Sequence, residues 1–365
     1  MAGSKTSRSD ASSGPRSART AHAVPDGRWL VRWNDGRLTA YALTPGGLLR
    51  WTETRPGGPQ WTGPDYFATP GVQDISLTQG ANGYVHLFGR RLKGTGQSAI
   101  PEVVHAIQYQ PGRPLTEWAG VGNPHGRNER AVHMGAPVAA VSASGTVHVF
   151  VRNAGGGVCV RRENTKGAWL AWGDMRGGGG LDGLAAGVLR SGRIEVLVTG
   201  ADCAMHWAQS HNDGDMERRR NLRVAPAPGS ATALETGPDR LTFYWTDLAT
   251  GQVQACRPGG WAIPMGSSPA AGRLAAVRAL VDGYDCTVLA HQALDGHVFL
   301  ALCGTENEQA GVWWSPTGET SAHQPALVCD ARGRLVLAVI GAAGELRIAR
   351  QGPEPGLLLD QAVSV

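Results

Sequence analysis

A unit of about 45 residues recurs along this chain, and its most regular copy runs from Ala136 to Gly180. In that copy Val147, Val149 and Val151 alternate with other side chains, and clusters of Gly, Asn and Ser separate the apolar runs. Period-2 alternation interrupted by such clusters predicts short antiparallel strands joined by tight turns. Because one such unit cannot bury its apolar faces alone, the repeat predicts units that pack on one another.

The copies are predicted at residues 22–70, 71–126, 127–180, 181–229, 230–272, 273–322 and 323–365. No segment shows a helical period of useful length. Seven units of four strands predict an all-β fold, namely a seven-bladed β-propeller of four-stranded antiparallel blades in a single ring-shaped domain. Six or eight blades are the alternatives, because the first and last units are the least regular.

The innermost strand of a propeller blade lies against a crowded central channel, where small side chains fit best. Small apolar runs occur at residues 138–141, 184–187, 274–277 and 325–328, and we expect them to be innermost strands. The second unit carries an insertion, Arg91 to Pro101, which we place between its second and third strands.

Composition and charge limit the partners. The formal net charge of 365 residues is only +4, which does not predict nucleic-acid binding. No apolar run reaches the length of about 18 residues that a membrane span needs. Residues 1–21 are rich in Ser and Arg and lack the apolar segment of a secretory signal. We expect a disordered tail on a cytoplasmic protein, with a trimmed leader or another route of secretion as the alternative.

The cysteines favour reduced thiols. No two of them have C-x-x-C spacing, and most are flanked by apolar or small residues, as expected for buried free thiols. The alternative is a disulfide, with Cys286 and Cys303 facing each other across a hairpin. The six are Cys159, Cys203, Cys256, Cys286, Cys303 and Cys329.

Three motifs stand out within the units. The strand Gly145 to Val151 has the form G-x-x-x-V-F-V, and Trp169 to Trp172 has the form W-x-x-W. H-x-x-Q occurs twice, at His105–Gln108 and His206–Gln209. Together with the repeat, these motifs resemble the bacterial PLL-like lectin group of seven-bladed propellers. The resemblance implies sugar pockets that recur around the ring.

Sugar recognition requires an aromatic face for the C–H side of the ring and polar groups for its hydroxyls. The predicted ligand-binding residues are Trp118, Trp169, Trp172, His105, Gln108, His206 and Gln209, with Trp207, Trp313 and Trp314 as further aromatic candidates. The alternative is that these side chains brace the blades, since buried His and Gln need hydrogen-bond partners in either case.

Metal and cofactor signals are weak. His206 and His211 are five residues apart, but no third ligand is near. The segment 212–215 resembles a fragment of a calcium loop, yet it lacks the later Glu and is more simply a hairpin turn. We therefore predict no metal site and no cofactor.

The run from Met216 to Arg223 is the one concentrated basic segment. We expect a solvated loop between the outer strands of the fourth unit. The sharper hypothesis is that it contacts an anionic partner or an acidic protein surface.

Propellers often bind ligands where loops converge at the mouth of the central channel. Carboxylates with His and Arg there would be the constellation that an enzyme needs, although turn capping explains most of these Asp residues. The candidate polar groups are Asp26, Asp74, His133, Arg190, Glu235, Asp282 and Asp330, of which Asp282, Asp330 and His133 are the catalytic candidates.

Three functions follow from these patterns. The first is a non-catalytic binding module whose ligand is a carbohydrate or glycoconjugate. The second is a protein-interaction scaffold in a larger assembly, using the Arg218–Arg223 segment and the 91–101 insertion. The third is an unusual enzyme of the lyase, cyclase or hydrolase type with its site at the channel mouth. The oligomeric state is left open.

Overall fold

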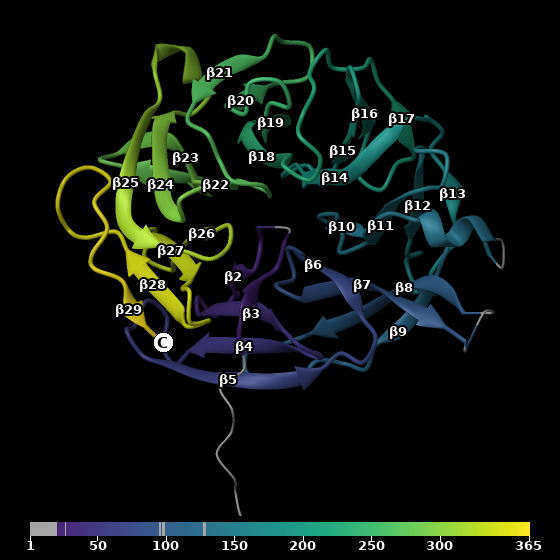
Figure 1. Cartoon of the computed structure of the whole chain (residues 1–365), viewed down its shortest axis with the longest axis horizontal. Coiled ribbons are helices and arrows are strands. Elements are labelled where there is room, and N and C mark those ends of the chain that lie inside the picture. Colours follow the sequence, from purple (N-terminus) through teal and green to yellow (C-terminus); the bar gives the residue numbers. More distant parts are fainter. Residues whose placement is uncertain (1–19, 26, 95, 97–98, 127–128) are drawn as a thin grey trace, which may run out of the picture.

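Seven antiparallel sheets form a closed ring around a central channel (Figure 1). The computed structural model describes residues 20–25, 27–94, 96, 99–126 and 129–365. Residues 1–19 of the predicted tail, and Asp26, lie outside the described residues. Six sheets have four strands, and the sheet of blade 1 has five because its innermost strand is interrupted. The predicted all-β, seven-bladed propeller is confirmed.

The strands follow the chain blade by blade. Blade 1 holds β1 (His22–Ala23), β2 (Leu30–Arg32), β3 (Leu38–Thr44), β4 (Gly47–Glu53) and β5 (Trp61–Ala68); blade 2 holds β6 (Gln73–Gln79), β7 (Val85–Lys93), β8 (Ile100–Gln108) and β9 (Ala119–Gly122); blade 3 holds β10 (Val138–Val141), β11 (Val147–Arg152), β12 (Val158–Arg162) and β13 (Gly173–Asp174); blade 4 holds β14 (Gly180–Val188), β15 (Ile194–Gly200), β16 (Ala204–Gln209) and β17 (Met216–Arg218).

The remaining blades have the same order. Blade 5 holds β18 (Thr232–Gly237), β19 (Arg240–Thr246), β20 (Val253–Cys256) and β21 (Ile263–Gly266); blade 6 holds β22 (Ala275–Val281), β23 (Tyr284–Gln292), β24 (His297–Gly304) and β25 (Trp313–Thr320); blade 7 holds β26 (Ala326–Cys329), β27 (Leu335–Ile340), β28 (Leu346–Arg350) and β29 (Val363–Ser364). Among the described residues, the short 3-10 helices η2 (Glu129–His133) and η3 (Glu308–Ala310) lie in connections. In the part of the chain that the structure describes, no helix is long and apolar enough to span a membrane.

Each blade packs both faces of its sheet against its two neighbouring blades, as blade 4 shows. In β15, Val196 packs in a cluster with residues of blade 3, whereas Leu197 packs in a cluster with residues of blade 5. Successive side chains of a strand point to opposite faces of the sheet. The middle strands are therefore buried along most of their length, as in β15, whereas an outermost strand such as β5 is mostly exposed.

The small apolar runs lie where the sequence predicts them, in the first strand of each blade. β10, β14, β22 and β26 carry them. Gly187, Ala276 and Val328 from three of these strands line the central channel. Small side chains there let seven sheets converge on one axis.

One polar position braces the blades from inside. Gln209, at the end of β16, accepts a hydrogen bond from the Ile194 backbone N–H at 2.8 Å and donates to the Gly214 carbonyl at 2.7 Å. It thereby joins the third strand to the second and to the following loop. Gln351 makes the same pair of bonds in blade 7. This repeated glutamine satisfies backbone groups that would otherwise be buried without partners.

Blade 1 carries a carboxylate at the same position. Glu53 Oε2 accepts hydrogen bonds from the backbone N–H of Leu38 at 2.8 Å and of Gly57 at 3.3 Å. Its other oxygen accepts a hydrogen bond from Arg350 at the end of β28 in blade 7. Glu53 is fully buried, so this contact crosses the interface between the first and last blades.

A second carboxylate extends the contact between blades 7 and 1. Asp330 pairs with Arg334 at 2.8 Å and lies 3.6 Å from Arg350. Arg32 of β2 donates to the Asp330 carbonyl oxygen at 3.0 Å. Because the described strands of these two blades belong to separate sheets, side-chain contacts of this kind close the ring.

Substitution of Arg350 tests the closing contact. Arg350→Met is expected to lower the free energy of unfolding by about 3–5 kcal/mol, because the Glu53 carboxylate would stay buried without its cation. Urea unfolding followed by tryptophan fluorescence measures the change.

The double variant Glu53→Gln/Arg350→Met is the matched control. Glutamine occupies the corresponding position in blades 2, 4 and 7, so the double variant is expected to be more stable than Arg350→Met alone. Equal instability of the two variants would show that the unpaired charge is not the cause.

Candidate functional site

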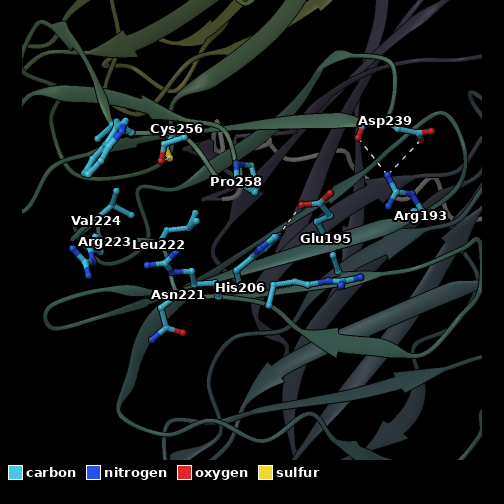
Figure 2. A pocket seen from close by; sticks show the side chains of 17 residues that line it. Arg193, Glu195, His206, Asn221, Leu222, Arg223, Val224, Asp239, Cys256 and Pro258 are labelled. Atoms are coloured by element: carbon cyan, nitrogen blue, oxygen red, sulfur yellow. Dashed lines mark hydrogen bonds and ion pairs between the residues drawn. The ribbon is translucent and has the colours of Figure 1, made fainter.

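A pocket lies between blades 4 and 5 (Figure 2). Its volume is 490 Å³, within the range of about 300–1,000 Å³ typical of small-molecule sites. Blade 4 supplies residues from β15, β16 and the segment after β17. Blade 5 supplies the turn before β19 and the connection between β20 and β21. The lining residues are Arg193, Glu195, His206, Ala208, Arg219–Val224, Asp239, Cys256 and Pro258–Ala262.

A histidine and a carboxylate form the floor of this pocket. His206 Nε2 lies 2.8 Å from Glu195 Oε2, and both side chains are nearly buried. Figure 2 shows the pair at the centre, between the Leu222–Val224 side and the Asp239 side. The contact orients the His206 ring, which also meets Phe243 of blade 5 edge-on at 5.9 Å. A fixed imidazole–carboxylate pair offers both donor and acceptor positions to a polar ligand.

An exposed tryptophan borders the pocket. Trp261 is 84% exposed and lies in the connection before β21. Strand β21 begins two residues later, at Ile263. The structure therefore adds Trp261 to the candidate site. The preceding Gly259–Gly260 pair was the available signal, because two glycines favour a turn that would leave the next side chain outside the sheet.

Arginines dominate the rim. The basic run expected as a loop instead begins with the outermost strand, since Met216 to Arg218 form β17. The following segment, 219–224, lines the pocket. On the other side Arg193 approaches Asp239 of blade 5 at 3.6 Å, which links the two blades.

The two residues of each H-x-x-Q motif face different grooves. His206 faces blade 5, whereas Gln209 faces blade 3, where its Nε2 lies 3.4 Å from His148 Nε2. Residues three apart on a strand point to opposite faces, so one ligand cannot reach both. His105 and Gln108 divide in the same way: Gln108 accepts a hydrogen bond from the Tyr41 hydroxyl of blade 1 at 2.7 Å.

His105 lies in the groove between blades 2 and 3, among aromatic rings. It stacks on Phe88 with centroids 4.3 Å apart, and Trp169 of blade 3 meets it edge-on at 5.7 Å. Its Nε2 lies 3.0 Å from His86 Nδ1. Trp172 packs against the same cluster. The structure thus brings the predicted residues His105, Trp169 and Trp172 together, in tight mutual packing.

The other tryptophans have varied surroundings. Trp118 lines a separate 500 Å³ cavity between blades 1 and 2, with Tyr66 and Phe67. Trp207 is buried and donates to the Met175 carbonyl at 2.9 Å, and Trp314 donates to the Met265 carbonyl at 2.7 Å. Trp313, in the outer strand β25, is 68% exposed.

The catalytic candidates of the sequence lie apart. Asp330 is buried in the contact between blades 7 and 1, and Asp282 accepts hydrogen bonds from the Gly356 N–H at 2.9 and 3.1 Å. Both lie in turns between the first and second strands of their blades. His133 is exposed on η2, which packs against β8 of blade 2. The structure does not bring these three side chains together.

The central channel is a cavity of 610 Å³ with several arginines. Arg190 approaches Glu235 at 3.7 Å, and Arg278 pairs with Asp285 at 2.6 Å. The Arg278 contact lowers the pKa of the Asp285 carboxyl. Arg28 reaches across the channel and donates to the Ala186 carbonyl of blade 4 at 2.8 Å. Elsewhere Asp74 pairs with Arg90 at 2.6 Å.

All six cysteines are free thiols in the structure, which agrees with the prediction from spacing. Burial raises the pKa of the Cys303 thiol to about 12, and the nearby Glu308 adds to the effect. Among the described residues, no group of three or more His, Cys, Asp or Glu side chains is arranged to hold a metal ion.

Known structures of similar fold include lectins and polysaccharide-acting enzymes. A lectin from Burkholderia pseudomallei, BP39L, superposes with a TM-score of 0.67 at 12% identity, over 94% of this chain and 98% of the lectin. A polysaccharide lyase, described as an ulvan lyase, gives 0.57 at 11% identity over 95% of each chain. A Hadza microbial sialidase gives 0.51 at 11% identity, over 87% of this chain and 73% of the sialidase.

These similarities show the fold alone. That fold agrees with the resemblance to lectin propellers. No protein-family model matches the sequence, and no curated protein matches it. Carbohydrate-related propellers of more than one activity share this architecture, so function must be argued from the side chains of the site.

Buried histidines predict a pH dependence of stability. Burial lowers the pKa of His86 to about 4 and that of His105 to about 3, with the adjacent His86 contributing to the latter shift. Both groups start from 6.5. Below that pH the unfolded chain takes up protons that the folded chain does not. Stability is therefore expected to be full above about pH 6.5 and to fall towards pH 4.

The variant His105→Gln isolates one of these groups. Between about pH 6 and pH 4.5, the slope of unfolding free energy against pH should decrease by about 1.4 kcal/mol per pH unit, the value for one proton. Urea unfolding at a series of pH values measures the slope. An unchanged slope would mean that His105 is not held neutral.

Proposed function

We propose that this propeller is a non-catalytic carbohydrate-binding protein whose ligand occupies the pocket between blades 4 and 5. The observation that carries the proposal is the combination there of an exposed Trp261 with the buried His206–Glu195 pair. An aromatic face beside fixed hydrogen-bonding groups is what an amphipathic sugar ring requires.

The two parts of the site serve different sides of a sugar. The Trp261 indole supplies an apolar surface that is already clear of other side chains. Among the described residues, the Glu195 side chain hydrogen-bonds only with His206. Its second carboxylate oxygen can therefore accept from sugar hydroxyls. Because both floor residues lie on adjacent strands, their positions are set before the ligand arrives, which reduces the cost of binding.

The groove between blades 2 and 3 is the natural comparison. It has His105 and Trp169 from the same motifs, but the tryptophan covers the histidine there. The groove between blades 4 and 5 leaves its histidine at the bottom of an open pocket. The similarity in fold to lectin propellers supports a carbohydrate ligand without identifying one.

Trp261→Ala is expected to weaken glycan binding by about tenfold or more, because the stacking surface is lost. A glycan array identifies a ligand, and isothermal titration calorimetry measures its affinity. Unfolding midpoints should be unchanged, since Trp261 is exposed.

Trp313→Ala provides the matched control, because it removes another exposed tryptophan from a different blade. Its affinity should equal that of the original protein. Equal losses in both variants would place binding elsewhere, and absence of binding to every glycan at millimolar concentration would overturn the proposed function.

A further inference from the structure

The arginines that follow β17 divide into engaged and free groups. Arg218 lies over the Trp207 ring, with Cζ 4.4 Å from the ring centroid, and donates to the His206 carbonyl at 3.3 Å. Arg219 lies 3.0 Å from Glu217. These two arginines therefore already have structural partners within blade 4.

Arg220 and Arg223 differ from both. Their side chains are exposed, and among the described residues neither has a hydrogen-bond or ion-pair partner. Both line the pocket between blades 4 and 5, and Figure 2 shows Arg223 at the edge opposite Asp239. Two unpaired guanidinium groups thus stand at the rim of one pocket.

The backbone beneath these arginines is fixed. Leu222, between them, exchanges two hydrogen bonds with Ala204 of β16, at 2.9 and 3.0 Å. Leu222 and Val224 are buried in the cluster shared with blade 5. The arginines project from an anchored segment rather than a free loop, so less entropy is lost when they bind a ligand.

Charge is unevenly placed within the pocket. The floor carries the Glu195 carboxylate, whereas the rim carries Arg220 and Arg223. A small inorganic anion would be attracted by the rim and repelled by the floor. A molecule with hydroxyls at one end and an anionic group at the other matches both regions.

We propose that the ligand is an acidic carbohydrate, a sugar that bears a carboxylate or a sulfate, and that Arg220 and Arg223 bind this anion. The inference rests on the proposed function and adds the class of sugar. Guanidinium groups suit this role because their N–H groups pair with carboxylate or sulfate oxygens in a fork. Hydroxyls of the same sugar would face His206 and Glu195, with the ring against Trp261.

A nucleic acid is the other polyanion to consider. Its binding gains strength with the number of phosphates contacted, and this rim offers only two unpaired arginines. The Glu195 floor and the single exposed Trp261 favour one sugar unit over a phosphate backbone. Nucleic-acid binding therefore enters as an outcome of the test.

The test compares Arg220→Gln/Arg223→Gln with Arg55→Gln/Arg113→Gln. The control pair also removes two exposed arginines whose side chains pair with no other described residue, but from blades 1 and 2. An array of acidic and neutral glycans is screened first. Affinities are then measured for matched probes, namely oligogalacturonate with its methyl ester and chondroitin sulfate with desulfated chondroitin, together with the best array ligand and its neutralised form.

At least one acidic form should bind about tenfold or more tightly than its neutral counterpart. The pocket variant should lose that difference, whereas the control variant should keep it. Trp261→Ala should weaken the acidic and neutral forms alike.

Other outcomes overturn specific steps. If acidic and neutral forms bind equally and both depend on Trp261, the proposed function stands and the acidic preference is wrong. If no glycan binds, both fail. Equal losses in the control variant would indicate a general charge effect. Binding of a single-stranded oligonucleotide that depends on Arg220 and Arg223 but not on Trp261 would replace the sugar with a phosphate backbone.

Discussion

Contact between Glu53 and Arg350 joins the two ends of the ring, and the geometry of every groove depends on that closure. Blade 1 is built only from the beginning of the described chain and blade 7 only from its end. Elsewhere a covalent connection leads from each blade to the next. At this one interface, the buried Glu53–Arg350 ion pair takes its place, together with the hydrogen bonds from Arg32 to the Asp330 carbonyl and from Arg334 to the Gly57 carbonyl. A closed ring sets the angle between blades 4 and 5, and so the width of their pocket.

The same motif has different outcomes in different grooves. In blade 2, His105 is enclosed by Phe88 and Trp169, and burial keeps it neutral. In blade 4, His206 pairs with Glu195, meets Phe243 edge-on and lines the 490 Å³ pocket. The difference comes from the neighbouring blade, whose short Gly259–Gly260 turn directs Trp261 outward. Differences between the repeats therefore include the turns of the neighbouring blade that face each H-x-x-Q histidine. The groove of His105 is packed with aromatic rings, whereas that of His206 contains a pocket.

The sequence allowed the fold to be predicted because alternation and turns are local signals. Val147, Val149 and Val151 alone indicate a strand with a buried face, and seven such units leave few architectures. His206 was likewise among the predicted site residues. Glu195 and Trp261 were not, because their role arises from contacts between strands and between blades. That His206 and Gln209 face different grooves can be predicted from strand geometry alone, because residues three apart on a strand lie on opposite faces.

The hydrogen bond that Arg28 makes across the channel affects how the ring unfolds. In an array where each unit touches only its neighbours, one interface can fail without affecting units further away. Arg28 links blade 1 directly to Ala186 of blade 4, across the channel. Separation of blade 1 would therefore withdraw a hydrogen bond from the half of the ring that holds the pocket. Loss of order at the chain ends is coupled in this way to the distant pocket between blades 4 and 5, which favours concerted rather than stepwise melting.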